Sequence, residues 1–238
     1  MHRAMKLIYP DQCILCDSLV DGPGNLCGTC WAEMPFKNGH LCDLCGADLI
    51  GEGDGTFDHC DQCLERARPW VRGRAAIAYR DSGRRVVLGL KHGDRTDLIP
   101  SASRWMAEVG RDFLSCDSVL VPVPLHWTRV IRRRYNQAAE LAKGISRHHA
   151  ALCVPDALIR VRNTEKQDGK GVEERYQNVD DAVVVNGKRS NLLKDRDVCI
   201  VDDVMTSGAT LSACAQACHD MGARQVYVLV LARVDQTP

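Results

Sequence analysis

Four Cys-x-x-Cys pairs in the first 63 residues constrain the fold of this chain more than any other feature. They hold eight of its 13 cysteines: Cys13, Cys16, Cys27, Cys30, Cys42, Cys45, Cys60 and Cys63. Each pair places two thiolates on one tight turn, and two such pairs complete a tetrahedral four-cysteine zinc site. The same segment has too few large apolar residues for a core of its own, so metal binding would supply most of its folding free energy. The pattern therefore predicts a zinc-ribbon module.

The spacing of the pairs indicates, without deciding, how they combine. Short spacers separate the first pair from the second and the third from the fourth, which favours one zinc ribbon in each half. A crossed arrangement, first with third and second with fourth, is an alternative, and so is a single occupied site. We expect one or two Zn2+ ions with a structural role, because a site closed by four thiolates leaves no open position for catalysis.

The cysteine pairs stop before the segment Arg66-Ala67-Arg68-Pro69-Trp70, after which apolar and helical patterns begin. We therefore expect a double zinc ribbon at residues 1–66 and a second domain at residues 67–238. The 31 basic and 31 acidic residues balance, which excludes a global basic field for nucleic acid. Apolar runs long enough for membrane insertion are absent, and the first residues lack a signal-peptide pattern. The predicted localisation is cytoplasmic, where paired cysteines bind metal rather than form disulfides.

Short apolar runs alternate with helical patterns in the second domain. The expected strands are residues 74–79, 118–123, 197–201 and 225–231. The expected helices are residues 82–91, 98–113, 136–149 and 211–221. Alternation of this kind predicts an α/β fold, a parallel sheet with helices on its faces. In such sheets, ligands bind beyond the carboxyl ends of the strands.

The best-defined candidate site begins where the strand at 197–201 is expected to end. Asp202 and Asp203 stand at this point, and residues 206–210 lead directly into the next helix. These residues provide hydroxyls, a glycine that permits close backbone approach, and the free N–H groups of a helix N-terminus, which together suit a phosphate. The two carboxylates beside them are placed for hydroxyls or a metal ion. Either feature alone has an ordinary explanation, an unrelated magnesium site or a helix cap, but together they favour a phosphorylated ribose.

The segment from Cys199 to Thr210 resembles the PRPP-binding motif of type I phosphoribosyltransferases, PRPP being 5-phosphoribosyl 1-diphosphate. With the N-terminal cysteine module, nearly the whole chain resembles the ComF family (competence protein F, GntX-like). Further similar segments are Pro122-Val123-Pro124-Leu125-His126, Tyr135-Asn136-Gln137 and Lys91-His92-Gly93-Asp94, with Tyr79 before them. The chain departs from the family at Arg134, where glycine is usual, and at Lys170-Gly171, where Leu-Ser is usual.

The resemblance implies a magnesium-dependent phosphoribosyltransferase, a glycosyltransferase of the pentosyl class, with the type I phosphoribosyltransferase fold. Asp202 and Asp203 would be catalytic and bind the ribose hydroxyls, with Mg2+ accompanying PRPP. The residues implied in PRPP binding are Val204, Met205, Thr206, Ser207, Gly208, Ala209 and Thr210. The candidates for pyrophosphate binding or for a lid are Pro124, Leu125, His126, Arg129, Arg132, Arg133, Arg162, Gln167 and Arg175. Residues 160–178 are polar and contain glycine, which suits a lid that excludes water.

The implied partners are PRPP and an acceptor that the sequence does not identify. The family's link to DNA uptake and natural transformation adds single-stranded DNA or a protein of the competence machinery. The alternative to an enzyme is therefore a non-catalytic protein of the same fold that senses PRPP or a nucleotide, or that handles single-stranded DNA. A third interpretation, a zinc-ribbon adaptor with a relic domain, is disfavoured by the intact aspartate pair at residues 202 and 203.

Overall fold

A parallel five-stranded sheet forms the centre of the computed structural model, which describes residues 10–53, 55, 57–92, 95–125, 135–162, 171–179 and 182–235. The strand order is β1-β7-β6-β2-β3. The strands are β1 (Arg72–Ala78), β2 (Val119–Pro122), β3 (Leu152–Cys153), β6 (Asp197–Met205) and β7 (Gln225–Arg233). The central strands are short apolar runs because both faces of the sheet are covered. The predicted α/β class is confirmed.

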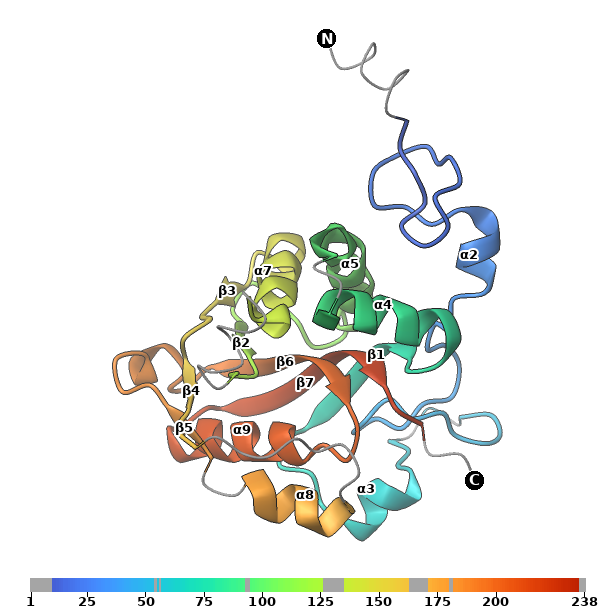
Figure 1. Cartoon of the computed structure of the whole chain (residues 1–238). Coiled ribbons are helices and arrows are strands. Elements are labelled where there is room, and N and C mark those ends of the chain that lie inside the picture. The colour runs from blue at the N-terminus through green and yellow to red at the C-terminus, as the bar shows by residue number, and fades with distance from the viewer. Residues whose placement is uncertain are drawn as a thin grey trace.

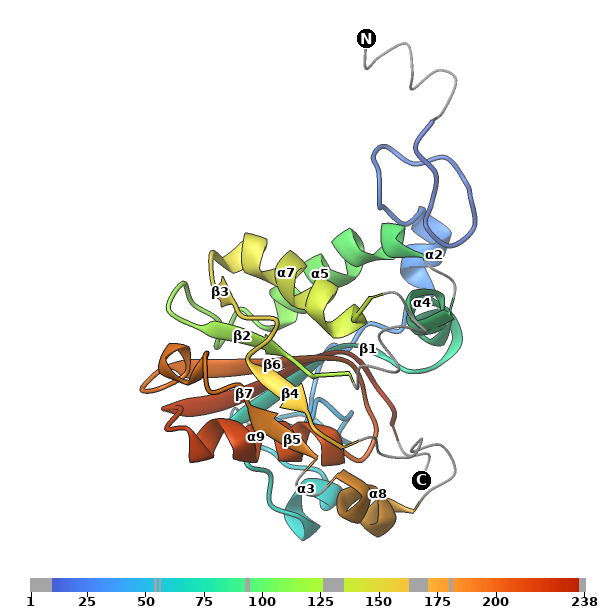
Figure 2. The ribbon, with the colours of Figure 1, turned by 60° about the vertical axis from the view of Figure 1, so that its left-hand side comes forward.

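Helices cover the two faces of the sheet unequally (Figure 1, Figure 2). One face carries α4 (Asp81–His92), α5 (Ile99–Val109) and α7 (Gln137–His149), and the other carries α9 (Ala209–Asp220). The shorter helical elements are α2 (Gly28–Ala32), α3 (Asp61–Glu65), η1 (Thr96–Leu98), α8 (Val172–Val179) and η2 (Ser190–Leu192). The four longer helices agree with the helices expected from apolar periodicity, and most of their ends lie within a few residues of the expected positions.

A small two-stranded antiparallel sheet and helix α8 form a separate layer, which we call the hood. The sheet pairs β4 (Leu158–Arg160) with β5 (Val183–Val185). The sequence predicted only a polar lid here, because strands of three residues are too short to show an alternating pattern. The hood lies on the α9 side of the sheet, where Leu158 and Val183 join the same apolar cluster as α9.

The expected end of the strand before the acidic pair was wrong. We expected it to stop at Val201, but β6 continues through Asp202 and Asp203 to Met205. The extension follows from the neighbouring strand, since β7 also runs on and pairs residue 202 with Val230 and residue 205 with Arg233. The carboxylates therefore stand on a paired strand rather than on a loop, which gives their backbone a rigid support.

The two zinc-ribbon halves pack on opposite faces of the sheet. Ile14 and Met34 of the first half join the apolar cluster that contains α4, α5 and α7. The cysteines of the second half join the cluster beneath α9. Between the halves, the chain runs along edge strand β1, where the N–H of Lys37 donates to the Ala76 carbonyl at 3.0 Å. The ribbons therefore share their core with the sheet and cover an edge that would otherwise be open.

Candidate active site and metal centres

The acidic pair on β6 is held by cations from two distant parts of the chain. Lys91, near the end of α4, places its Nζ 3.2 Å from Oδ1 of Asp203. The N–H of Asp203 donates to Oδ1 of Asp202 at 2.8 Å. Arg160, buried at the end of β4, contributes a second positive charge that acts on Asp202. The pair can therefore offer acceptor oxygens to hydroxyls while its repulsion is partly neutralised.

The sequence pattern gave neither Lys91 nor Arg160 a contact with the acidic pair. Lys91 belongs to a segment that resembles the family but carried no predicted role. Arg160 follows the apolar residues Leu158 and Ile159, and a charged residue at the end of such a stretch is the only signal that the sequence offers. Both residues reach the acidic pair through tertiary structure, because they lie more than about 40 positions from it along the chain.

Burial sets the protonation of Asp202. Removal from water raises its pKa to about 7, and the charge of Asp203 acts in the same direction. The N–H of Asp203 and the charges of Lys91 and Arg160 act in the opposite direction. Asp202 is therefore partly protonated near neutral pH, and a ligand that needs its ionised form should bind more tightly as the pH rises.

We expect Asp202→Asn to stabilise the fold at alkaline pH. The folded protein retains the Asp202 proton up to about pH 7, whereas an ordinary aspartate releases it near 3.8, so the wild-type free energy of unfolding falls as the pH rises through this window. Asparagine does not titrate, so the variant should gain about 1–4 kcal/mol over wild type between pH 4 and pH 8. Urea unfolding at both pH values measures this gain. A difference in free energy of unfolding between the two proteins that stays the same at pH 4 and pH 8 would contradict it.

The turn between β6 and α9 is shaped by two arginines. Gly208 adopts a left-handed φ of +83° at the N-cap of α9. Nη1 of Arg68 donates to the Ser207 carbonyl at 2.7 Å, and Nη1 of Arg233 donates to the Thr206 carbonyl at 2.8 Å. The two arginines thus bind consecutive carbonyls of the turn. The turn leads into the N-terminus of α9, where the helix dipole favours an anion.

Gly208→Ala should destabilise the protein more than Gly39→Ala. Both glycines have a left-handed φ, which costs another residue about 1–2 kcal/mol. An added Cβ meets nothing within 4 Å at Gly39, but lies 2.9 Å from Nη1 of Arg68 at Gly208. Displacing that guanidinium also breaks charged hydrogen bonds, so we expect a total loss of about 3 kcal/mol at Gly208. Denaturant unfolding measures both, and equal losses would show that the Arg68 contacts contribute nothing.

The predicted phosphate-binding residues differ in their surroundings. Ser207, Gly208 and Ala209 are buried at the turn, while Thr206 and Thr210 are half-buried. Val204 is half-buried and packs against the cluster on the α4 side. The Met205 side chain is buried in the cluster beneath α9. The Met205 side chain therefore supports the turn from within the core, and the role of Met205 in PRPP binding stays a prediction.

The structure locates only some of the predicted pyrophosphate and lid residues. Pro124 and Leu125 follow β2, which pairs with β6, so they lie at the same edge of the sheet as the acidic pair. Arg162 is exposed just after β4, and Arg175 is half-buried on α8. The remaining candidates lie outside the described residues: His126, Arg129, Arg132, Arg133 and Gln167.

The segment Tyr135-Asn136-Gln137 ties the ends of β2 and α4 together. The Asn136 side chain caps α7 by accepting from the Ala138 N–H at 3.1 Å, and it donates to the Val123 carbonyl at 3.0 Å. Tyr135 and Gln137 both donate to the Leu90 carbonyl, at 2.7 and 3.1 Å. Leu90 precedes Lys91, so this segment holds the backbone from which Lys91 reaches Asp203.

Both groups of N-terminal cysteines fit Zn2+. Among the described residues, the Sγ atoms within each group lie within 4.8 Å of one another. A tetrahedral site with Zn–S bonds of about 2.3 Å needs Sγ separations of roughly 3.8 Å. The groups are Cys13, Cys16, Cys27 and Cys30, and Cys42, Cys45, Cys60 and Cys63. One ribbon in each half is confirmed, and the crossed arrangement is not the one present.

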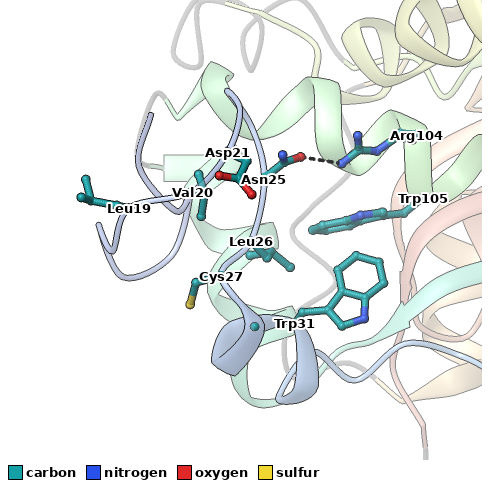
Figure 3. A pocket seen from close by; sticks show the side chains of 10 residues that line it. Leu19, Val20, Asp21, Asn25, Leu26, Cys27, Trp31, Arg104 and Trp105 are labelled. Carbon is teal, nitrogen blue, oxygen red and sulfur yellow. Dashed lines mark hydrogen bonds between the residues drawn. The ribbon is translucent and has the colours of Figure 1, made fainter. Parts of the chain in front are cut away.

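A hollow of about 400 Å³ lies away from the acidic pair, between the first ribbon and α5 (Figure 3). Trp31 and Trp105 border it, and Nη2 of Arg104 donates to Oδ1 of Asn25 at 3.4 Å on its rim. None of the residues that line it belongs to the acidic pair or the turn after β6. The hollow is therefore not part of the candidate active site.

Comparisons with known proteins agree with this architecture. Residues 4–72 match a family model described as a double zinc ribbon domain, and residues 122–238 match one described as a phosphoribosyl transferase domain. A parallel α/β sheet with this acidic pair and turn, joined to two four-cysteine clusters, defines a phosphoribosyltransferase-type protein with a double zinc ribbon. Over nearly its whole length the chain is similar to proteins of the competence protein F type.

Relatives align with nearly the whole chain. "Competence protein F" of Haemophilus influenzae is 27% identical over 96% of this chain and 100% of the relative. "DNA utilization protein YhgH" of Escherichia coli K12 is 29% identical over 95% and 99%. "Competence protein ComFC" of Bacillus subtilis is 26% identical over 92% and 83%. Among solved structures, an allosteric regulatory enzyme of purine biosynthesis aligns at 15% identity and a TM-score of 0.40, over 60% of this chain and 30% of that chain, which is too weak to bear on function.

The helices of the described residues give no candidate for a membrane span. None of them combines the length and the apolar composition that crossing a bilayer requires.

Proposed function

We propose that the chain binds Mg–PRPP at the carboxyl end of β6 and transfers its phosphoribosyl group to a nitrogen acceptor. The observation that carries this proposal is the uninterrupted order of the acidic pair, the turn at residues 206–208 and the N-terminus of α9. The 5-phosphate would lie at the turn, and the ribose hydroxyls would donate to Asp202 and Asp203. The similarity to competence protein F over nearly the whole chain and the match to the phosphoribosyl transferase domain support it.

The reaction breaks the bond between C1 of the ribose and pyrophosphate, and the bonding electrons leave with pyrophosphate. Positive charge then develops on the ribose ring, and ionised carboxylates at residues 202 and 203 would stabilise it electrostatically. Lys91 and Arg160 would favour the ionised form of the two carboxylates, in opposition to the burial that raises the pKa of Asp202. Bound Mg2+ would neutralise the charge that builds on the leaving group. The nitrogen of the acceptor would form the new bond to C1.

Pyrophosphate and the acceptor would approach beside Pro124 and Leu125, which follow the strand next to β6. Of the described cations, Arg162 just after β4 and Arg175 on α8 are our candidates for closing over the leaving group. Exclusion of water there would prevent hydrolysis of PRPP. We further propose two structural Zn2+ ions in the ribbons and a cytoplasmic location, where thiolates stay reduced.

A second candidate function is the handling of single-stranded DNA without catalysis. The observation that favours it is that full-length relatives are named as competence and DNA utilization proteins. The phosphoribosyltransferase fold would then bind PRPP or a nucleotide as a signal. A partner in the competence machinery would be the natural target of such a signal.

Two measurements separate these functions. Calorimetry with Mg–PRPP, followed by an assay of pyrophosphate release across a panel of nucleobases, tests the transferase. Base-dependent release supports it, and a failure to bind Mg–PRPP contradicts it. A mobility shift of labelled single-stranded DNA that weakens steeply with salt supports DNA handling. PRPP binding without release for any base, together with that shift, would favour the second function.

A further inference from the structure

Arg68 joins three parts of the molecule that are far apart in sequence. Its Nη1 donates to the Ser207 carbonyl at 2.7 Å and to the Tyr176 hydroxyl of α8 at 2.6 Å. Its Nε donates to Sγ of Cys63, a member of the second cysteine cluster, at 3.4 Å. The Tyr176 hydroxyl also donates to the Ser207 carbonyl, at 3.1 Å. One guanidinium thus contacts the turn, the hood and the second ribbon.

Arg233 makes a similar connection between the preceding peptide of the turn and the second ribbon. It is 2% exposed and donates from Nη1 to the Thr206 carbonyl at 2.8 Å. Its Nη2 donates to Oε1 of Gln62 on α3 at 3.0 Å. Gln62 directly precedes Cys63, so the two arginines that hold the turn contact adjacent residues of the second ribbon.

The geometry of the peptide bond links these contacts to the front of the turn. A peptide is planar and trans, so its C=O and N–H point in opposite directions. Arg68 on the Ser207 carbonyl therefore directs the N–H of Gly208 away from Arg68. Arg233 on the Thr206 carbonyl likewise directs the N–H of Ser207 away from Arg233. Neighbouring N–H groups oriented in this way are the donors from which backbone anion sites are built.

We propose that the second zinc ribbon shapes the phosphate-binding turn through Arg68, a positioning residue. The identity of the ligand rests on the proposed function, whereas the link between ribbon and turn rests on the contacts of Arg68 alone. Zinc would fix Cys63 and the start of α3, and these hold Arg68 and Arg233 in place. Zinc in the second cluster and PRPP at the turn should therefore stabilise each other's binding by the same factor.

The first ribbon lacks these connections among the described residues. Its polar contacts with the sheet domain run to the other face, where Arg85 donates to the Leu15 carbonyl at 2.9 Å and Arg95 to the Ile14 carbonyl at 2.8 Å. Loss of zinc from the first cluster should therefore leave the turn unchanged. This difference between the two ribbons provides an internal control.

Three variants of the full-length, zinc-loaded protein test the proposal: Arg68→Met, Arg68→Lys and Arg66→Met. Arg66 is the matched control, because it lies 4.2 Å over the Tyr176 ring and pairs with Glu173 but makes no described contact with the turn. In Arg68→Met we expect hydrogen exchange at Ser212, whose N–H donates to the Gly208 carbonyl at 2.8 Å, to accelerate and Mg–PRPP affinity to fall, each about tenfold or more. Arg68→Lys should restore part of both, and Arg66→Met should change neither.

The readouts distinguish failure of this inference from failure of the proposed function. Unchanged exchange at Ser212 in both Arg68 variants would overturn the positioning role. Faster exchange in a protein that binds no PRPP would support the role and reject the proposed ligand. If Arg68→Met does not fold, Arg68→Lys and selective loss of zinc through Cys60→Ser carry the test, with Cys16→Ser as the control. Equal exchange in those two cysteine variants would also overturn the proposal.

Discussion

Replacing both aspartates, Asp202→Asn with Asp203→Asn, should abolish Mg–PRPP binding while the fold remains intact. The two amides cannot supply the ionised oxygens that the ribose hydroxyls and the developing positive charge require. We expect the affinity measured by calorimetry to fall by more than about 100-fold, the equivalent of about 3 kcal/mol. The folded state should persist, because the substitution removes the repulsion between two neighbouring carboxylates, which helps to raise the pKa of Asp202.

Asp197→Asn is the matched control for this experiment. Asp197 lies at the opposite end of β6, where it pairs with Arg224 at 2.8 Å. Its substitution removes a carboxylate and an ion pair from the same strand but leaves the carboxyl end of the strand unchanged. The control should bind Mg–PRPP as wild type does. Unchanged affinity in the double variant would reject the proposed site, and a loss of secondary structure by circular dichroism would trace any weaker binding to unfolding.

Cys45→Ser should lower the melting temperature far more than Cys16→Ser. Cys45 is fully buried in the apolar cluster that contains α9 and the central strands, whereas Cys16 is exposed. Loss of zinc from the second cluster would leave buried thiols within the core of the sheet domain, and structural zinc contributes several kcal/mol or more to folding. We expect a decrease of at least about 10 °C for Cys45→Ser.

Scanning calorimetry with parallel metal analysis measures this difference. Each variant should lose about one zinc ion per chain, so the two substitutions are matched in metal loss and differ only in where the cluster packs. Cys16→Ser should disturb only the first ribbon and its contacts with α4 and α5. Equal decreases in melting temperature would contradict the unequal integration of the two clusters.

Most elements could be predicted from the sequence because their signals are local. Apolar periodicity predicted α4, α5, α7 and α9, and apolar runs predicted β1, β2, β6 and β7. The length of β6 could not be predicted in this way, because Asp202 and Asp203 interrupt its apolar run and the strand continues past them only through pairing with β7. The strands β4 and β5 have three residues each, which is too few for a periodic pattern.

The residues of the site can be divided in the same way, into those with a local signal in the sequence and those without one. Asp202, Asp203 and the turn that follows are contiguous, so a motif reveals them together. Lys91 and Arg160 reach the acidic pair from α4 and from the hood, and nothing in their local sequence indicates that they converge. Arg68 and Arg233 show this most clearly, since they hold the carbonyls of residues 207 and 206 from positions just before β1 and at the end of β7.

By itself, the sequence determined the parts whose chemistry is local: the cysteine pairs that can hold zinc, the phosphate-type turn beside two carboxylates, and the class of the sheet. Only the tertiary structure decided that the two ribbons lie on opposite faces of that sheet and that the second reaches the turn through Arg68. The physical reason is that a metal knuckle or a turn is specified by a few neighbouring residues. Packing against a sheet edge, and the burial that shifts the pKa of Asp202, arise only when distant segments exclude water together.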